Sequence, residues 1–106
     1  RPGQGAWQGG GQAVPVLALA EGFETARAFT ILHDIPCWTS LGARRLDQLL
    51  LPSSLTSLIL AVDNDAEGAI AAERAALRYA RPDLAITPMP PKGVKDWAKV
   101  LEMSRR

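Results

Sequence analysis

Residues Leu58 to Gly68 read L-I-L-A-V-D-N-D-A-E-G, and this stretch decides the fold. Its first five residues are continuously aliphatic, which is typical of a strand that is buried on both faces of a parallel sheet. The segment Ala66 to Ala80 is rich in Ala and ends before Pro82, so it is predicted to form a helix. A strand that turns directly into a helix is the unit from which layered α/β folds are built.

The same alternation of short apolar runs and helical segments extends along the chain in both directions. Further strands are predicted at Val14–Ala20, Ile35–Thr39 and Leu84–Thr87, and further helices at Phe23–His33, Arg44–Leu51 and Trp97–Met103. This order implies parallel pairing and right-handed crossovers. We therefore predict a Rossmann-like α/β fold, with a central parallel four-stranded sheet and helices on both faces.

The long helix carries two distinct stripes at helical spacing. One stripe is charged and is predicted to face solvent; it consists of Glu67, Arg74 and Arg78. The opposite stripe is small enough to lie close against a sheet; it consists of Ala69, Ala72, Ala76 and Ala80. In the helix Phe23–His33, the apolar positions Phe23, Ala26, Phe29 and Leu32 likewise predict a buried face.

Composition restricts the classes of protein. The 106 residues suit one domain, and 12 Lys plus Arg against 11 Asp plus Glu exclude a strongly basic surface that grips nucleic acid by charge alone. The single Cys37 excludes a disulfide framework and is predicted to be a small buried hydrophobe. Without a long apolar run or a signal peptide, we expect a cytoplasmic domain with no membrane contact. Residues 1–13 are predicted to be a flexible Gly-rich leader, and residues 14–106 a domain excised from a longer protein.

Acidic residues follow three of the predicted strands. Glu21 follows the first, Asp63 and Asp65 follow Leu58–Val62, and Asp96 lies in the loop after Leu84–Thr87. Ligands of open parallel sheets bind at the carboxyl ends of the strands, and gathered carboxylates repel one another unless a cation such as Mg²⁺ neutralises them. Simpler interpretations remain open. Asp65 can cap the following helix, Asp63 can be a solvated turn residue, and Glu21 can interact with a helix dipole.

Other catalytic signatures do not occur in the sequence. It has no G-x-S-x-G turn and no phosphate-binding P-loop, and the only His, His33, lies at a predicted helix end, where a structural role is expected. Arg44 and Arg45 follow the second predicted strand, where they either hold phosphate or form a solvated face. The same two interpretations apply to Lys92 and Lys95 near the last acidic loop.

In their order along the chain, these motifs resemble the Toprim domain, which bacterial-type primases, type IA and type II topoisomerases and some nucleases share. The similar runs are L-A-L-A-E-G (17–22), T-S-L-G-A (39–43) and L-A-V-D-N-D-A-E-G (60–68). The run M-P-P-K-G-V-K-D-W (89–97) resembles the acidic loop of the primase branch, as found in phage and plasmid primase–helicases. The resemblance extends from Val16 to about Leu101.

The resemblance implies a role for each matching residue. Glu21 corresponds to an invariant acid that acts in proton transfer, and Asp63 and Asp65 correspond to a D-x-D metal pair, so these three are the expected catalytic residues. The expected ligands of Mg²⁺ or Mn²⁺ are Glu21, Asp63, Asp65 and Asp96. The glycines expected beside the bound cofactor are Gly22, Gly42 and Gly68, and Arg44 is expected there from its place after the second strand. Ala98 and Lys99 stand where members of the family usually carry another acid or amide. A second metal site is therefore not implied, and Lys99 is a candidate source of positive charge.

The function that this resemblance implies is nucleotidyl transfer by a DNA primase that makes RNA primers for replication. Its expected partners are a single-stranded DNA template and nucleoside triphosphates, with a helicase domain or protein nearby in the full-length protein. The alternatives are a Toprim nuclease or topoisomerase fragment, or a metal-binding docking module without catalysis. A topoisomerase needs a nucleophilic Tyr, and Tyr79, the only Tyr in the chain, is predicted to be a core residue.

Overall fold

The computed structural model describes residues 15–40 and 45–105. The elements are strands β2 (Val16–Ala20), β3 (Cys37–Thr39), β4 (Ser57–Leu60) and β5 (Ala85–Pro88), helices α1 (Phe23–His33), α2 (Ala66–Tyr79) and α3 (Trp97–Ser104), and the 3₁₀ turn η1 (Leu46–Gln48). The predicted leader, Gly42 and Arg44 lie outside the described residues. None of the helices within the described ranges combines the length and the hydrophobicity needed to cross a lipid bilayer.

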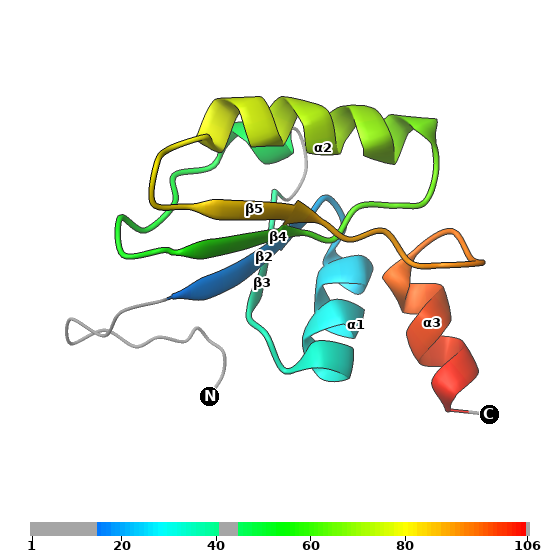
Figure 1. Cartoon of the computed structure of the whole chain (residues 1–106). Coiled ribbons are helices and arrows are strands. Elements are labelled where there is room, and N and C mark those ends of the chain that lie inside the picture. Colours follow the sequence, from blue (N-terminus) through cyan, green and yellow to red (C-terminus); the bar gives the residue numbers. More distant parts are fainter. Residues whose placement is uncertain (1–14, 41–44, 106) are drawn as a thin grey trace.

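All four strands run parallel in the order β3-β2-β4-β5, which confirms the predicted α/β class (Figure 1). The chain builds β3 on one side of β2 and then crosses to the other side to build β4. The strand that follows β2 in the chain therefore lies on one side of the β2–β4 pair, and the strand that follows β4 lies on the other. Such a switch point is where open α/β sheets bind their ligands. In this register Leu17 lies opposite Leu58 and Leu19 lies opposite Leu60.

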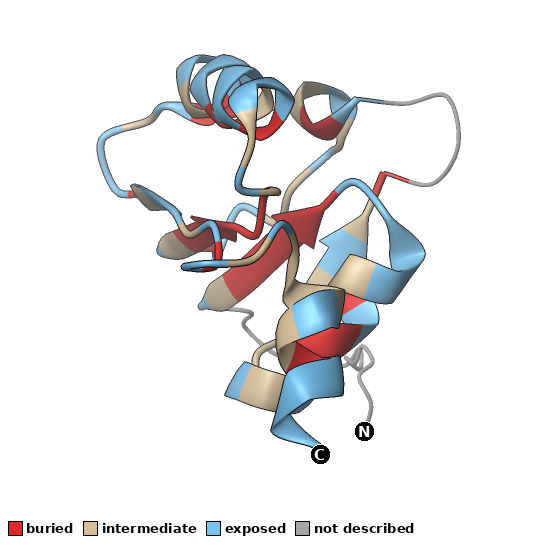
Figure 2. Ribbon diagram, turned by 90° about the vertical axis from the view of Figure 1, so that its right-hand side faces the viewer, coloured by how far each residue is buried: buried red, intermediate tan, exposed pale blue. Residues whose placement is uncertain are grey.

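The sheet separates two hydrophobic cores, because successive side chains along a strand point to opposite faces. Leu17, Leu19 and the facing leucines of β4 pack beneath α2, whereas Ala18 and Ala20 pack against α1. Figure 1 shows α2 on one side of the sheet and α1 with α3 on the other, and Figure 2 shows the buried strands between these layers. Large strand residues thus meet the small residues of α2, and the small Ala18 and Ala20 leave room for Phe29 of α1.

The face that α2 buries differs from the predicted one. The charged stripe is exposed as expected, but the buried residues are Gly68, Ala72, Ala75 and Tyr79, while Ala69 and Ala80 are exposed. The helix is rotated by about one residue relative to the Ala stripe, because Gly68 fits closely at one end and the Tyr79 ring enters the core at the other. The prediction for Phe23 is also wrong: its side chain is 65% exposed at the first position of α1.

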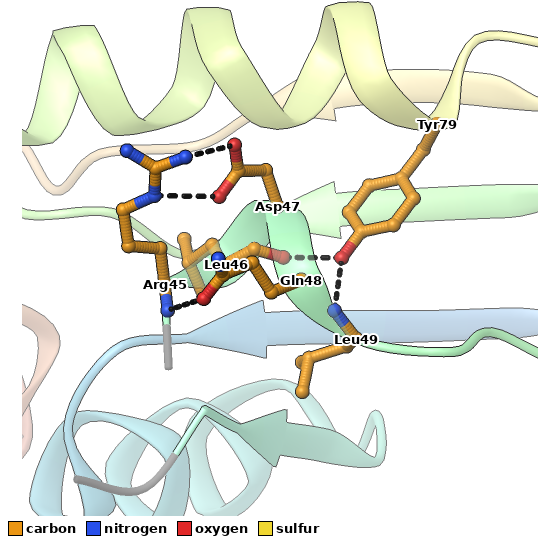
Figure 3. Close-up of polar contacts among 6 residues, drawn as sticks. All are labelled: Arg45, Leu46, Asp47, Gln48, Leu49 and Tyr79. Atoms are coloured by element: carbon orange, nitrogen blue, oxygen red, sulfur yellow. Dashed lines mark hydrogen bonds and ion pairs between the residues drawn. The ribbon is translucent and has the colours of Figure 1, made fainter. Parts of the chain in front are cut away.

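The predicted helix Arg44–Leu51 is wrong, since residues 45–51, the described part of this segment, form only the short turn η1. The reason lies 30 residues away, at the end of α2. The Tyr79 hydroxyl donates to the Leu46 carbonyl and accepts from the Leu49 N–H at 2.9 Å (Figure 3). Both are groups that an α-helix through this segment would need for its own i to i−4 bonds. Pro52 then follows after a short extended stretch.

We expect Tyr79→Phe to lower the free energy of unfolding by about 1–3 kcal/mol, because it leaves the buried Leu46 carbonyl and the Leu49 N–H without their partner. Urea unfolding followed by circular dichroism measures the change. Thr56→Val is a suitable control, since it removes an exposed hydroxyl that donates to the Pro15 carbonyl. A loss for Tyr79→Phe no larger than that of the control would contradict the structural role of the hydroxyl.

Candidate functional site

Two acids come together because β2 and β4 are neighbours in the sheet. Glu21 follows β2 directly, and Asp63 follows β4 after Ala61 and Val62, both of which are buried. The Ala61 N–H donates to the Leu19 carbonyl at 2.8 Å, so the pairing with β2 continues beyond the last residue of β4. Both acids therefore lie at the carboxyl ends of adjacent strands, as the sequence predicted, and this edge is also the switch point of the sheet.

Asp65 caps the helix that follows it. Its backbone is extended and its Oδ1 accepts a hydrogen bond from the Gly68 N–H at 2.7 Å, as the capping interpretation predicted. A carboxylate has a second oxygen with free lone pairs, so the cap leaves Oδ2 available for a cation. The hydrogen bond also fixes the direction of the carboxylate, and the two interpretations of Asp65 are therefore compatible.

Gly68 allows the first turn of α2 to lie directly on the Asp63 backbone. A Cβ at this position would stand 2.1 Å from the Asp63 carbonyl oxygen and 2.9 Å from its carbonyl carbon, both far inside van der Waals contact. Gly68 thereby determines where Asp63 lies. Gly22, by contrast, has φ −110°, and a Cβ added there would have no described atom within 4 Å, so the geometry at Gly22 does not require glycine.

The loop after β5 returns to the acidic turn and brings Asp96 with it. Asn64, between the two aspartates, donates from its backbone to the Lys95 carbonyl at 2.6 Å and from its side chain to the Val94 carbonyl at 3.3 Å. Asp96 caps α3 by accepting from the Lys99 N–H at 2.8 Å. Sequence patterns do not single out Asn64, because its partners are 30 residues away.

Aromatic packing anchors α3, which begins directly after Asp96. The Trp97 Nε1 donates to the Met89 carbonyl at 2.8 Å, and the Trp97 ring meets Phe29 and His33 edge-on, with centroids 5.4 and 4.9 Å apart. His33 also stacks on Phe29 at 4.2 Å, with its Nδ1 3.3 Å from the Phe29 carbonyl oxygen. His33 therefore belongs to an aromatic cluster with Phe29 and Trp97, as the structural role predicted for it implies.

The acids lie at one edge of the sheet, called the acidic edge below, and their negative charges repel one another. Desolvation raises the pKa of Glu21, and the negative charges of Asp63, Glu67 and Asp65 raise it further. Desolvation also raises the pKa of Asp63, as do Asp65 and Asp96, whereas the ammonium of Lys95 partly offsets the effect. Each of the four predicted acids thus interacts electrostatically with at least one of the others.

Glu67 is an acid of this edge that sequence reasoning missed. It belongs to the predicted solvent-facing stripe of α2, and it is exposed, but it also acts on the pKa of both Glu21 and Asp63. The signal that could have found it is its position in the first turn of the helix, two residues after Asp65. Side chains of a first turn point back toward the loop that precedes the helix.

The donor set suits a hard divalent cation such as Mg²⁺ or Mn²⁺, because it consists of carboxylate oxygens whose repulsion a cation would relieve. Within residues 15–40 and 45–105, however, no three His, Cys, Asp or Glu side chains stand close enough to hold one ion together. The arrangement therefore fits an ion with one or two direct carboxylate ligands, its other positions being filled by water or phosphate, as Mg²⁺ accepts.

Of the other candidate side chains, Arg45 and Lys99 have local partners. Both carboxylate oxygens of Asp47 accept from the Arg45 guanidinium, at 3.1 and 3.2 Å (Figure 3). The Lys99 ammonium lies 3.1 Å from a Glu102 carboxylate oxygen, so Lys95, not Lys99, is the cation that acts on Asp63. Burial raises the pKa of Cys37 to about 12, which keeps it a protonated thiol that packs against the core beneath α1.

The order of the strands defines a Rossmann-like α/β domain. Its acidic edge consists of carboxylates at the strand ends, with α2 packed directly on the D-x-D turn. The Toprim domain family matches residues 16–105, nearly the whole chain. The chain therefore belongs to the Toprim domain family. Domains of this family bind divalent metal ions and carry out nucleotidyl-transfer, nuclease or topoisomerase chemistry on nucleic acids. No curated protein and no solved structure matches the chain.

Proposed function

We propose that this chain is the nucleotidyl-transfer domain of a DNA primase, which joins nucleoside triphosphates into an RNA primer on a single-stranded DNA template. The observation that carries the proposal is the loop 89–96. Its sequence resembles the acidic loop of the primase branch, and its carbonyls at Val94 and Lys95 are tied to Asn64 in the middle of the D-x-D turn. We place the protein in the cytoplasm, with a helicase domain or protein as its partner in replication.

The proposed reaction forms a bond between a primer 3′-hydroxyl oxygen and the α-phosphorus of the incoming nucleotide, and it breaks the bond to pyrophosphate. Most of the catalytic task is to position the reactants and to neutralise charge. Asp63 and Asp65 would hold Mg²⁺ or Mn²⁺ directly, with Glu21 and Asp96 completing the acidic surroundings. When bound, the cation supplies the positive charge that the triphosphate requires.

Glu21 is suited to accept the proton of the attacking hydroxyl. Its pKa is raised by desolvation and by three neighbouring acids, which makes its carboxylate a better proton acceptor than an isolated Glu. Asp65 contributes a carboxylate whose direction is fixed by its cap on α2. Gly68 holds Asp63 in place through close backbone packing. The chain itself thus pre-positions the acids before any ligand binds.

A nuclease would use the same acids with water as the attacking group, and a topoisomerase would use a Tyr. Tyr79 cannot serve as that nucleophile, because its hydroxyl is hydrogen-bonded to Leu46 and Leu49 and its ring is buried in the core beneath α2.

Assays of activity separate these alternatives. The protein that carries this domain should be incubated with single-stranded DNA, labelled nucleoside triphosphates and Mg²⁺ or Mn²⁺. Short labelled RNA is the expected product. Shortening of a labelled strand indicates a nuclease, relaxation of supercoiled DNA a topoisomerase, and cation binding without reaction a docking module.

The two roles of Asp65 allow a sharper test. Asp65→Ser keeps an oxygen that can cap α2 but removes the carboxylate, whereas Asp65→Ala removes both. We expect primer synthesis to fall about tenfold or more in both variants, and only Asp65→Ala to lose about 1 kcal/mol of stability in urea unfolding. Asp83→Ser, at an exposed acid in the turn before β5, is the matched control. Full primer synthesis by Asp65→Ser would exclude Asp65 from the reaction.

A further inference from the structure

A cavity of about 290 Å³ lies between α2 and the segment that contains η1, next to the acidic edge. One wall is a single face of α2, formed by Glu67, Ile70, Ala71 and Arg74 at i, i+3, i+4 and i+7. Residues 45–47 form the opposite wall, and Glu21 closes the end toward the acids. The cavity is therefore continuous with the proposed site, and its volume is near the lower end of that of small-molecule pockets.

The charge along this cavity changes sign. Glu21 and Glu67 make the end beside Asp63 negative. Arg74 comes seven residues after Glu67, which is about 10 Å further along the helix axis. Between the two ends the α2 wall is apolar, with Ile70 48% exposed, and it faces the buried Leu46 and the paired Arg45 and Asp47. An elongated ligand would match these surfaces if it carried one negative group for Arg74, a less polar body, and a second negative group that a divalent cation bridges to the acids.

Arg74 is available to a ligand. Arg45, on the opposite wall, is already paired with Asp47 through two hydrogen bonds. Arg74 forms no hydrogen bond or ion pair with any other residue of the ranges 15–40 and 45–105, and it is exposed. A guanidinium presents two parallel N–H groups that match the oxygens of a phosphate, and it keeps its charge at any physiological pH.

We propose that the cavity binds a nucleotide phosphate, with Arg74 as its ligand, while the sugar lies against Ile70 and Ala71. The inference rests on the proposed function, because it takes the reacting phosphate to lie at the acids. The phosphate at Arg74 is then either the outer phosphate of a nucleoside triphosphate or the next phosphate along a DNA strand. The two sources share one chemistry, and they are separated by the choice of probe.

The test measures binding of two probes to the 106-residue chain, ATP and a ten-nucleotide oligothymidylate, each with Mg²⁺ and with EDTA. Arg74→Ala should weaken binding of at least one probe about tenfold, and Arg74→Lys less, because it keeps the charge but not the paired donors. The probe that is weakened identifies the source of the phosphate. Arg78→Ala is the matched control: Arg78 lies one turn later on α2, outside the cavity, with its guanidinium 5.8 Å from the Tyr79 ring. It should change binding less than about twofold.

Equal losses in Arg74→Ala and Arg78→Ala would show general charge attraction and overturn the inference, and so would no loss in Arg74→Ala. Thermal unfolding of both variants checks that they remain folded. Binding of Mn²⁺ without nucleotide, measured by electron paramagnetic resonance, tests the proposed function separately. Mn²⁺ binding without Arg74-dependent phosphate binding contradicts this inference alone. Arg74-dependent phosphate binding without Mn²⁺ binding contradicts the proposed metal-dependent function alone.

Discussion

Gly68→Ala is expected to lower the free energy of unfolding by about 3 kcal/mol and to abolish cation binding at the acidic edge. The new Cβ would stand 2.1 Å from the Asp63 carbonyl oxygen, and this neighbour is backbone, which cannot rotate away as a flexible side chain can. The clash is relieved only if Asp63 moves or if the first turn of α2 lifts from the sheet. Lifting would break the bond from the Gly68 N–H to Asp65. Overpacking of this kind typically costs about 1–3 kcal/mol, and a backbone neighbour places Gly68 at the upper end.

Gly22→Ala provides the matched control for this substitution. Gly22 lies at the end of the neighbouring strand, its φ of −110° suits any L residue, and no described atom is within 4 Å of the added Cβ. Its stability should change by less than about 1 kcal/mol. Urea unfolding and Mn²⁺ titration of both variants measure the difference. Equal stability of Gly68→Ala and Gly22→Ala would show that α2 does not rest on Asp63 as described.

The layer arrangement could be predicted from the sequence because it depends on short-range patterns. The continuous run Leu58–Val62 and the Ala-rich segment after it have few alternatives to a buried strand and a helix, and four such strands favour a parallel sheet. The failures have long-range causes. The helix predicted at Arg44–Leu51 is replaced by η1 because Tyr79 takes the backbone groups that the helix would use. No pattern within Arg44–Leu51 reveals a partner in another element.

The candidate site was predictable to the same extent. The rule that ligands gather at strand ends placed Glu21, Asp63 and Asp65 at one edge, and the neighbouring positions of β2 and β4 agree with it. The sequence could not show that Asn64 ties the turn to the loop before Asp96, nor that Glu67 reaches back to the same acids. Both depend on the direction of side chains after folding. Spacing along the chain gives the candidates for a site, whereas packing determines which of them meet.

Asp63→Asn is expected to increase stability in the absence of divalent cations while it removes the response to them. In the folded chain the pKa values of Asp63 and Glu21 are raised, so between their ordinary and raised values the folded state binds more protons than the unfolded state. The free energy of unfolding must then fall as the pH rises from about 4 through the raised pKa values. Asn at position 63 removes one of the repelling charges. At pH 7 in EDTA the variant should therefore be about 0.5–1 kcal/mol more stable than the parent chain, and near pH 3.5 the difference should vanish.

Added Mn²⁺ should reverse this order. A cation that binds only the folded chain stabilises it by about 2.7 kcal/mol at a hundred times its dissociation constant, and Asp63→Asn should lose most of this gain. In the protein that carries the domain, primer synthesis should fall about a hundredfold, equivalent to about 3 kcal/mol of lost charge stabilisation.

Asp83→Asn, which changes an exposed acid outside the site, should match the parent chain in every measurement. Identical pH profiles for Asp63→Asn and the parent chain would show that the acids do not repel one another, and the physical basis for a cation at this edge would be lost. Repulsion among the acids thus makes the same carboxylate a source of instability in the free chain and a source of affinity for the cation.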